Sequence, residues 1–153
     1  MKRSGLEPVT VETGYRIDLE PGSSPGVVLE VLNPQREQAR PPRSDLNDNA
    51  VVLRLVYGET SFLLASDVEA KAEAAMSRDG TTLDSDVLKV AHHGSKTSTT
   101  DDFLERVDSE IVVISVGSRN SYGHPDPGVL ARLREMVGQA NIYRTDKHGS
   151  IEV

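Results

Sequence analysis

Short apolar runs alternate with longer polar runs over residues 51 to 137, and this alternation most limits the folds open to the chain. The apolar runs are rich in Val, Ile and Leu, which is typical of buried strands. The polar runs carry capping residues and alanine, which predict helices. The expected strands are 27–32, 51–57, 60–65, 87–91 and 111–116, and the expected helices are 68–78, 101–107 and 128–137. Such an order predicts an α/β (α+β layered) domain.

Weaker patterns flank this region. Residues 9–13 and 15–19 alternate like half-buried strands, and 141–145 with 150–153 predict a closing hairpin. Residues 34–48 contain three prolines among polar side chains and predict a mobile loop. We expect all 153 residues to form a single domain.

The composition excludes several classes of protein. The chain has no cysteine, so any metal must be held by His, Asp, Glu or backbone groups. Its net charge of −7 argues against a nucleic-acid binder with a broad basic surface, although a metal site can supply positive charge locally. No apolar run is long enough to span a bilayer, and the first residues lack a signal-peptide core, so we expect a soluble domain.

Polar side chains follow three of the expected strands at the point where each strand ends. They are Asp67, the pair His92-His93, and a loop with Asn120 and His124. Because strand ends in α/β proteins gather at one edge, where ligands bind, we expect these groups to converge. A carboxylate and neutral imidazoles suit a divalent ion when thiolates are absent. The pattern therefore favours a metal site, with at least one of the paired histidines in a functional role.

Each of these residues also has a plainer explanation, which the sequence leaves open. Asp67 can cap the helix that follows it. One of His92 and His93 can orient the other or bind a backbone carbonyl. The ring of His124 can simply pack on Tyr122.

The loop after the paired histidines carries hydroxyls and one lysine. Hydroxyl groups, an ammonium group and turn amides together suit a phosphate or an oxyanion. No serine lies in a nucleophile-elbow pattern, and no glycine-rich phosphate loop precedes a helix. We therefore expect Ser95, Lys96 and Thr97 to contact substrate.

Four sequence blocks together resemble a known family. They are NDNAVVLRL at 47–55, FLLASD at 62–67, LKVAHHGSKTS at 88–98, and ISVG at 114–117 followed by YGHP at 122–125. In order and spacing they resemble the metallo-β-lactamase-like domain of the ComEC family of DNA-uptake competence proteins.

The resemblance implies a metal-dependent hydrolase of αββα fold that acts as a nuclease on incoming DNA, beside a membrane channel. A divalent ion, Zn or Mn, would activate water and polarise a phosphodiester. By position, Asp67 and His93 match metal ligands of the family, and His92 is a weaker candidate. His124 matches the family's Tyr-Gly-His-Pro histidine, which implies a catalytic or substrate-contacting role, and Asn120 is a further candidate for substrate binding.

Two departures from the family pattern limit this expectation. Ala65-Ser66-Asp67 stands where the family usually has Thr-Gly-Asp, so the turn that aims the carboxylate lacks its glycine. The superfamily's first metal motif, of the form His-x-(His or Asp)-x-Asp-His, is absent. The chain thus resembles the C-terminal half of the domain, a mixed sheet covered by helices on one face. We expect weak activity or none from this half alone.

A half-domain should leave one sheet face apolar and prone to self-association. We expect either the missing N-terminal half or a second copy of the chain, as a homodimer, to cover that face. DNA and the membrane channel domain of the parent protein, in the bacterial cytoplasmic membrane, are the other implied partners. Two further functions stay open: a non-catalytic binding or assembly module of the same fold, and a hydrolase of another small ester or phosphoester.

Overall fold

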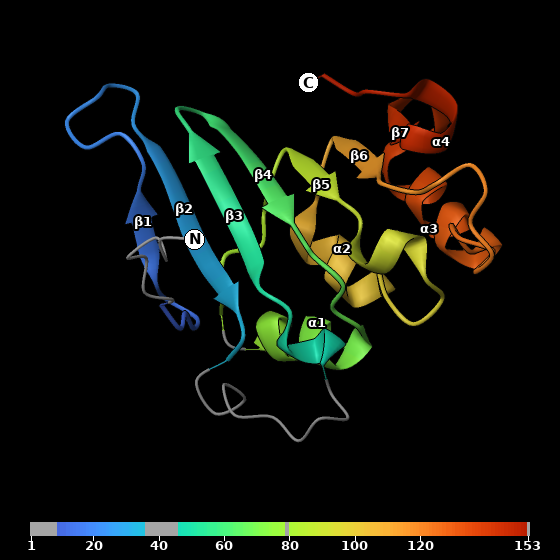
Figure 1. The fold of residues 1–153 in the computed structure, drawn as a ribbon, viewed down its shortest axis with the longest axis horizontal. Coiled ribbons are helices and arrows are strands. Elements are labelled where there is room, and N and C mark those ends of the chain that lie inside the picture. Colours follow the sequence, from blue (N-terminus) through green and yellow to red (C-terminus); the bar gives the residue numbers. More distant parts are fainter. Residues whose placement is uncertain (1–8, 36–45, 79, 153) are drawn as a thin grey trace, which may run out of the picture.

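A seven-stranded mixed sheet forms the centre of the chain (Figure 1). The computed structural model describes residues 9–35, 46–78 and 80–152. Strand order across the sheet follows the order along the chain. The strands are β1 (Arg16–Asp18), β2 (Val27–Asn33), β3 (Val52–Tyr57), β4 (Thr60–Leu64), β5 (Val87–Lys89), β6 (Ile111–Ile114) and β7 (Ile142–Arg144). The α/β layered class predicted from the alternation of strands and helices is confirmed.

The sheet has an antiparallel part and a parallel part. The strands β1 to β4 pair with one another in antiparallel order, and Gly58, with φ of +60°, closes the tight turn between β3 and β4. The strands β4 to β7 pair in parallel. All four parallel strands therefore end at the same edge, which we call the carboxyl edge.

Helices connect the parallel strands and pack on one face of the sheet (Figure 1). They are α1 (Ala70–Arg78), α2 (Asp101–Val107) and α3 (Pro127–Val137), and a short α4 (Thr145–His148) follows β7. Right-handed crossovers between strands that follow chain order place these helices on the same side. The core joins sheet and helix side chains that are fully buried, among them Leu63, Leu88, Val112, Met76, Phe103 and Leu133. No helix in the described parts of the chain has the length and apolar character needed to cross a bilayer.

The other face of the sheet carries mostly apolar side chains. Cross-strand pairs join Leu29 to Leu55, Leu55 to Phe62, and Leu53 to Leu64, so these side chains share one face. They are half-buried or exposed rather than covered, and 38% of Leu64 is exposed. We call this surface the open face: Ile17, Leu29, Leu53, Leu55, Phe62, Leu64, Ile111, Val113 and Tyr143. These apolar side chains are therefore not covered by any helix of the described residues.

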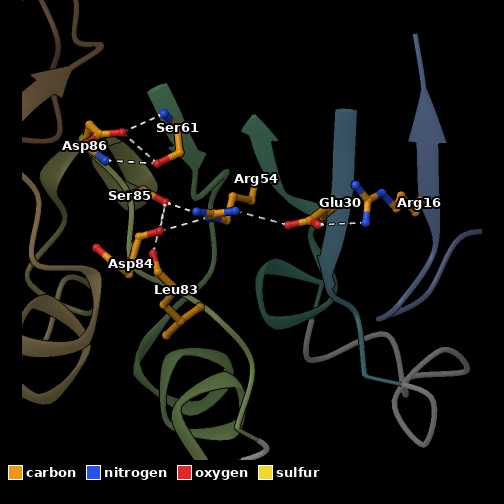
Figure 2. Close-up of polar contacts among 8 residues, drawn as sticks. All are labelled: Arg16, Glu30, Arg54, Ser61, Leu83, Asp84, Ser85 and Asp86. Atoms are coloured by element: carbon orange, nitrogen blue, oxygen red, sulfur yellow. Dashed lines mark hydrogen bonds and ion pairs between the residues drawn. The ribbon is translucent and has the colours of Figure 1, made fainter. Parts of the chain in front are cut away.

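A polar network ties the antiparallel strands to the residues before β5 (Figure 2). Arg54 lies between Glu30 (Nη1 to Oε2, 3.3 Å) and the main-chain oxygen of Asp84 (Nε to O, 2.9 Å). The main-chain N–H and the hydroxyl of Ser61 donate to Asp86 Oδ2, at 2.6 Å and 2.9 Å, and these bonds lower the pKa of Asp86. Such a carboxylate stabilises the fold at neutral pH and loses this effect as the pH falls through its folded-state pKa. Because Asp86 precedes β5, this network lies away from the carboxyl edge.

Two segments near the amino terminus depart from expectation or cannot be compared with it. Residues 9–13, expected as a strand, form none; Thr13 instead binds the main-chain oxygen of Pro34 through its N–H at 2.9 Å and its hydroxyl at 3.1 Å. Within the expected mobile loop 34–48, residues 36–45 lie outside the described residues. That expectation therefore stays a prediction.

The closing hairpin expected at the carboxyl end is wrong. β7 pairs in parallel with β6, and the chain then turns into α4 instead of returning as an antiparallel strand. Arg144 makes two contacts with the Asp146 carboxylate, at 2.9 Å and 2.7 Å, and Thr145 Oγ1 donates to the main-chain oxygen of Val116 at 2.8 Å. These contacts favour a helical turn over a hairpin turn. His148, at the end of that turn, is exposed.

Candidate functional site at the carboxyl edge

Three polar segments meet at the carboxyl edge of the parallel strands. Asp67 follows β4, and the turn Ala91–Gly94 follows β5. The loop with His124 follows β6. The main-chain N–H of His92 donates to the main-chain oxygen of Ser66 at 2.9 Å, which joins the first two segments. The convergence expected from the strand ends is therefore present.

Asp67 and His93 face one another at this edge, in a group of side chains with His92 and His124 that we call the pocket. Asp67 Oδ1 lies 3.7 Å from His93 Nε2, and 47% and 45% of the two side chains are exposed. His93 Nδ1 lies 2.7 Å from the main-chain oxygen of Ser115, and because a carbonyl only accepts, Nδ1 carries the proton. Nε2 then either holds a second proton and pairs with the carboxylate, or points a lone pair toward it. In the second state two electron-pair donors face one space, which suits a cation.

The backbone of the pocket is held in left-handed conformations. The angle φ is +50° at Ser66, +46° at His92 and +56° at His93. Each such non-glycine residue costs about 1–2 kcal/mol, and such residues gather at functional sites. Ser66 takes the place of the family's usual glycine and still adopts a glycine-like φ. The turn that presents Asp67 is therefore kept without the glycine.

His92 faces Glu69 and His124 rather than Asp67. Its ring centroid is 5.9 Å from that of His124 and 6.5 Å from that of His93. His92 Nδ1 lies 3.3 Å from Glu69 Oε1, yet this buried nitrogen has no hydrogen bond to any described residue. The two atoms are thus close but too poorly aligned for a hydrogen bond. His92 and His93 sit in one pocket but have different carboxylate neighbours.

The histidine of the third segment is held by its own loop. The ring of His124 stacks on Tyr122, with centroids 5.8 Å apart and planes at 14°. Asn120 Oδ1 accepts from the His124 N–H, and Asn120 Nδ2 donates to the His124 oxygen, both at 3.0 Å. Both polar atoms of the Asn120 side chain therefore form hydrogen bonds that stabilise the loop. Its role in substrate binding stays a prediction.

Gly94 locks the loops after β5 and β6 together. Its main-chain oxygen accepts from the N–H of Asp126 at 2.8 Å, and its φ is +80°. A Cβ at this position would lie 2.6 Å from the Cβ of Pro125. Only glycine fits this contact, so the approach of His92 to His124 depends on it.

The predicted phosphate-contacting residues differ in accessibility. Ser95 is 6% exposed, and its hydroxyl lies 3.0 Å from the hydroxyl of Thr97. Ser98 is buried and donates to the main-chain oxygen of Ala91 at 3.1 Å. Thr97 and Lys96 are exposed. The two exposed side chains are free to reach solvent, whereas the buried serines shape the turn.

A buried carboxylate that the sequence analysis missed holds this loop from below. Glu73 of α1 is fully buried and accepts from the N–H groups of Thr99 and Thr100 and from the Thr100 hydroxyl. Burial raises the pKa of Glu73, and these donors and the charge of Arg132 oppose the rise. Arg132 of α3 donates to the main-chain oxygen of Thr99 at 3.0 Å. Glu73 is one polar residue among several in its helix, so its sequence gives no signal of this role.

Lys89 is a second residue that the sequence analysis missed. Its Nζ donates to the main-chain oxygen of Ser66 at 3.2 Å, and the side chain is half-buried. Burial lowers the pKa of Lys89, and the charge of Asp67 opposes this shift. An ammonium group thus lies beside the turn that carries the candidate acid. Because Lys89 lies within an otherwise apolar strand, the sequence pattern did not indicate that it belongs to the site.

The plainer explanation of Asp67, as a helix cap, is wrong. α1 begins three residues later, at Ala70, and Asp48 Oδ1 instead accepts from an amide of its first turn, that of Ala72, at 3.3 Å. Asp67 therefore points to the pocket and does not close the helix.

The described residues do not form a metal site by themselves. Asp67 and His93 are near enough to reach one ion, since Zn–N and Zn–O distances are about 2.0–2.2 Å. However, no group of three His, Asp or Glu side chains within residues 9–35, 46–78 and 80–152 is arranged to hold an ion. Zinc sites in proteins keep at least three protein ligands as a rule. His92 does not supply the third.

These features define a class of protein: a layered α/β domain with an acid–histidine pocket at the carboxyl edge of a mixed sheet and an open apolar face. No family model matches the chain. The chain is 34% identical to ComE operon protein 3 of Bacillus subtilis over 81% of its length, 35% identical to competence protein ComA of Neisseria gonorrhoeae over 83%, and 36% identical to recombination protein 2 of Haemophilus influenzae over 84%. About 80% of the chain therefore matches a segment of ComEC-family competence proteins at 34–36% identity.

The similarity covers one part of these relatives. The matched segment spans 15% of the Bacillus subtilis protein, 18% of the Neisseria gonorrhoeae protein and 15% of the Haemophilus influenzae protein. What the whole relatives do therefore does not pass directly to this chain.

Proposed function

We propose that the chain is part of a metal-dependent phosphodiesterase that acts on DNA during DNA uptake. The observation that carries this proposal is the facing pair of Asp67 Oδ1 and His93 Nε2, 3.7 Å apart at the carboxyl edge. The name of one relative refers to competence and that of another to recombination, which supports DNA as the substrate class. The fold is consistent with half of a metallo-β-lactamase-like sandwich.

The site has features of a ligand set that awaits further donors. A histidine that binds metal usually gives its other ring N–H to a carbonyl or carboxylate, as His93 Nδ1 does to the Ser115 oxygen. That bond fixes the tautomer and aims Nε2 into the pocket. A bound Zn or Mn ion would supply Lewis acidity and an activated water. Because two donors are too few, we propose that another part of the parent protein supplies the rest.

The remaining side chains of the pocket have proposed supporting roles. His124, stacked on Tyr122, borders the pocket where it can contact substrate, and its loop is held by Asn120. The exposed Lys96 and Thr97 are proposed to contact the phosphate backbone of DNA.

Cleavage of labelled single-stranded DNA in the presence of Mn²⁺ tests this function. The isolated chain is expected to give little turnover, because two ligands hold an ion weakly. Within a chain of the relatives' length, cleavage is expected, and Asp67→Ala and His93→Ala should each reduce it about 100-fold or more. Lys147→Met, an exposed change in α4, is the matched control.

Two outcomes would contradict the proposal in different ways. If the long protein, meaning a chain of the relatives' length, still cleaved DNA at an undiminished rate with alanine at both positions, the catalytic site would lie elsewhere in that protein. Robust cleavage by the isolated chain, lost in Asp67→Ala, would show that this segment holds a complete site.

We further propose that the open face packs against another part of the parent protein. The membrane channel domain of that protein is proposed as a further partner of this segment. The relatives extend far beyond the matched segment, so such a covering layer is available to them. In the isolated chain the same face should drive pairing of two copies, since apolar side chains such as Leu55 and Phe62 cross its centre. Light scattering should give a mass that rises with concentration, and a monomer at every concentration would count against this.

A second candidate function is a non-catalytic assembly module of the same fold. The open face favours it, because that surface needs no chemistry to have a role. A fold and a self-association that are unchanged in Asp67→Ala, with no cleavage by the long protein, would select this function. The net charge of −7 also favours a small phosphoester over DNA as the substrate, because a negatively charged chain repels DNA.

A further inference from the structure

Lys89 is a charged residue on the same side of the sheet as the apolar residues of the open face. Cross-strand pairs place it between Leu64 of β4 and Val113 of β6, so it is a cation in a row of apolar side chains. Its position at the end of β5 brings it to the carboxyl edge. A charged group in such a row is costly unless it is paired or used.

The ammonium group of Lys89 can donate more hydrogen bonds than it forms with the described residues. An ammonium group has three donors, and the structure uses one of them, to the Ser66 oxygen at 3.2 Å. Lys89 makes no ion pair with any residue in the described ranges. Asp67, the nearby carboxylate, is instead turned toward His93. Two donors of a half-buried ammonium therefore remain for a ligand.

We propose that Lys89 binds a non-bridging oxygen of a phosphodiester held in the Asp67–His93 pocket. The neighbouring Leu64 and Val113 reduce the local dielectric, which strengthens a charge-assisted bond between an ammonium and a phosphate oxygen. The exposed Lys96, by contrast, meets its ligand in water. This inference rests on the proposed function for its substrate class, and it adds a binding residue that the strand pattern alone conceals.

The same bond to the Ser66 oxygen places the ammonium near the acid. Ser66 has a left-handed backbone, and its oxygen accepts from both Lys89 Nζ and the His92 N–H. The two donors thus hold the turn between them. Phosphate bound by Lys89 would lie beside the space that Asp67 and His93 face.

Nuclear magnetic resonance titration with dimethyl phosphate, in EDTA, tests the inference. In the wild-type chain the amide signals of Ser66, Asp67 and His92 are expected to shift and saturate in the millimolar range. Lys89→Met should weaken this binding at least tenfold, and Lys89→Arg should keep most of it. Lys147→Met is the surface control, and unchanged amide spectra without ligand establish that each variant is folded.

The outcomes separate this inference from the proposed function. Equal binding by wild type and Lys89→Met overturns the role of Lys89 and leaves the phosphodiesterase proposal standing. No saturable binding by the wild type also overturns it. Saturable binding that depends on Lys89, together with no DNA cleavage by the long protein, would keep the inference and refute the nuclease.

Discussion

Gly94→Ala is expected to destabilise the chain by about 2–4 kcal/mol and to move the two histidine loops apart. Two effects add at this position. The backbone has φ of +80°, which strains an L-residue, and the new Cβ would meet the Cβ of Pro125 at 2.6 Å. Because that neighbour is a rigid proline, the loops must shift. Urea unfolding measures the first effect, and loss of the ring contact between His92 and His124 in nuclear Overhauser spectra measures the second.

Ser66→Gly is the matched control for this change. It places glycine at another left-handed position of the same edge, with φ of +50°, and so removes strain. We expect it to alter stability by less than about 1 kcal/mol, in the stabilising direction. A Gly94→Ala variant as stable as this control would contradict the packing described here.

Glu73→Ala is expected to cost about 3–5 kcal/mol, the other large effect in the chain. The change leaves the N–H groups of Thr99 and Thr100 and the Thr100 hydroxyl without their acceptor inside the fold. It also removes the carboxyl group that lies near the charge of Arg132. Denaturant unfolding measures the loss, and amide exchange in the loop 95–100 should rise with it.

Glu73→Gln and pH provide the check on this account. The glutamine keeps one acceptor but turns an NH₂ group toward N–H donors, so its stability should lie between those of wild type and Glu73→Ala. Burial raises the pKa of Glu73, so its contribution is full below the unfolded-state pKa and declines as the pH rises through the folded-state pKa. The stability gap between wild type and Glu73→Gln should therefore narrow as the pH rises above about 4, the ordinary pKa of a glutamate. A gap that widens over this range would contradict the burial of the carboxylate.

Local patterns were sufficient for most of the elements. Helix α2 lies at 101–107, as expected. Pro127 begins α3 because its missing N–H costs nothing there, and Asp126 caps that helix by accepting from the Gly128 N–H at 2.8 Å. The strands at 111–114 and 87–89 follow directly from their β-branched and apolar runs. In each case the deciding interaction lies within a few residues.

The errors and omissions come from contacts between distant segments. The carboxyl end alternates like a strand, but the contact of Thr145 with Val116 holds it as a helical turn. Glu73 reaches a loop 26 residues away, and Lys89 reaches back 23 residues to Ser66. No spacing along the chain encodes such pairs, whereas Asp67 and His93 were found because both stand directly after strands of one parallel sheet.

The central claim is that Asp67 and His93 share one pocket and can hold one cation together. The most direct measurement follows the His93 ring nitrogens by ¹⁵N resonance during addition of Zn²⁺ to the wild-type chain and to Asp67→Ala. We predict that Nε2 shifts while Nδ1, bound to the Ser115 oxygen, keeps its proton, and that Asp67→Ala needs about tenfold more Zn²⁺. An Nε2 signal that ignores Zn²⁺, or one that responds equally in both proteins, would show that the two side chains do not act on the same ion.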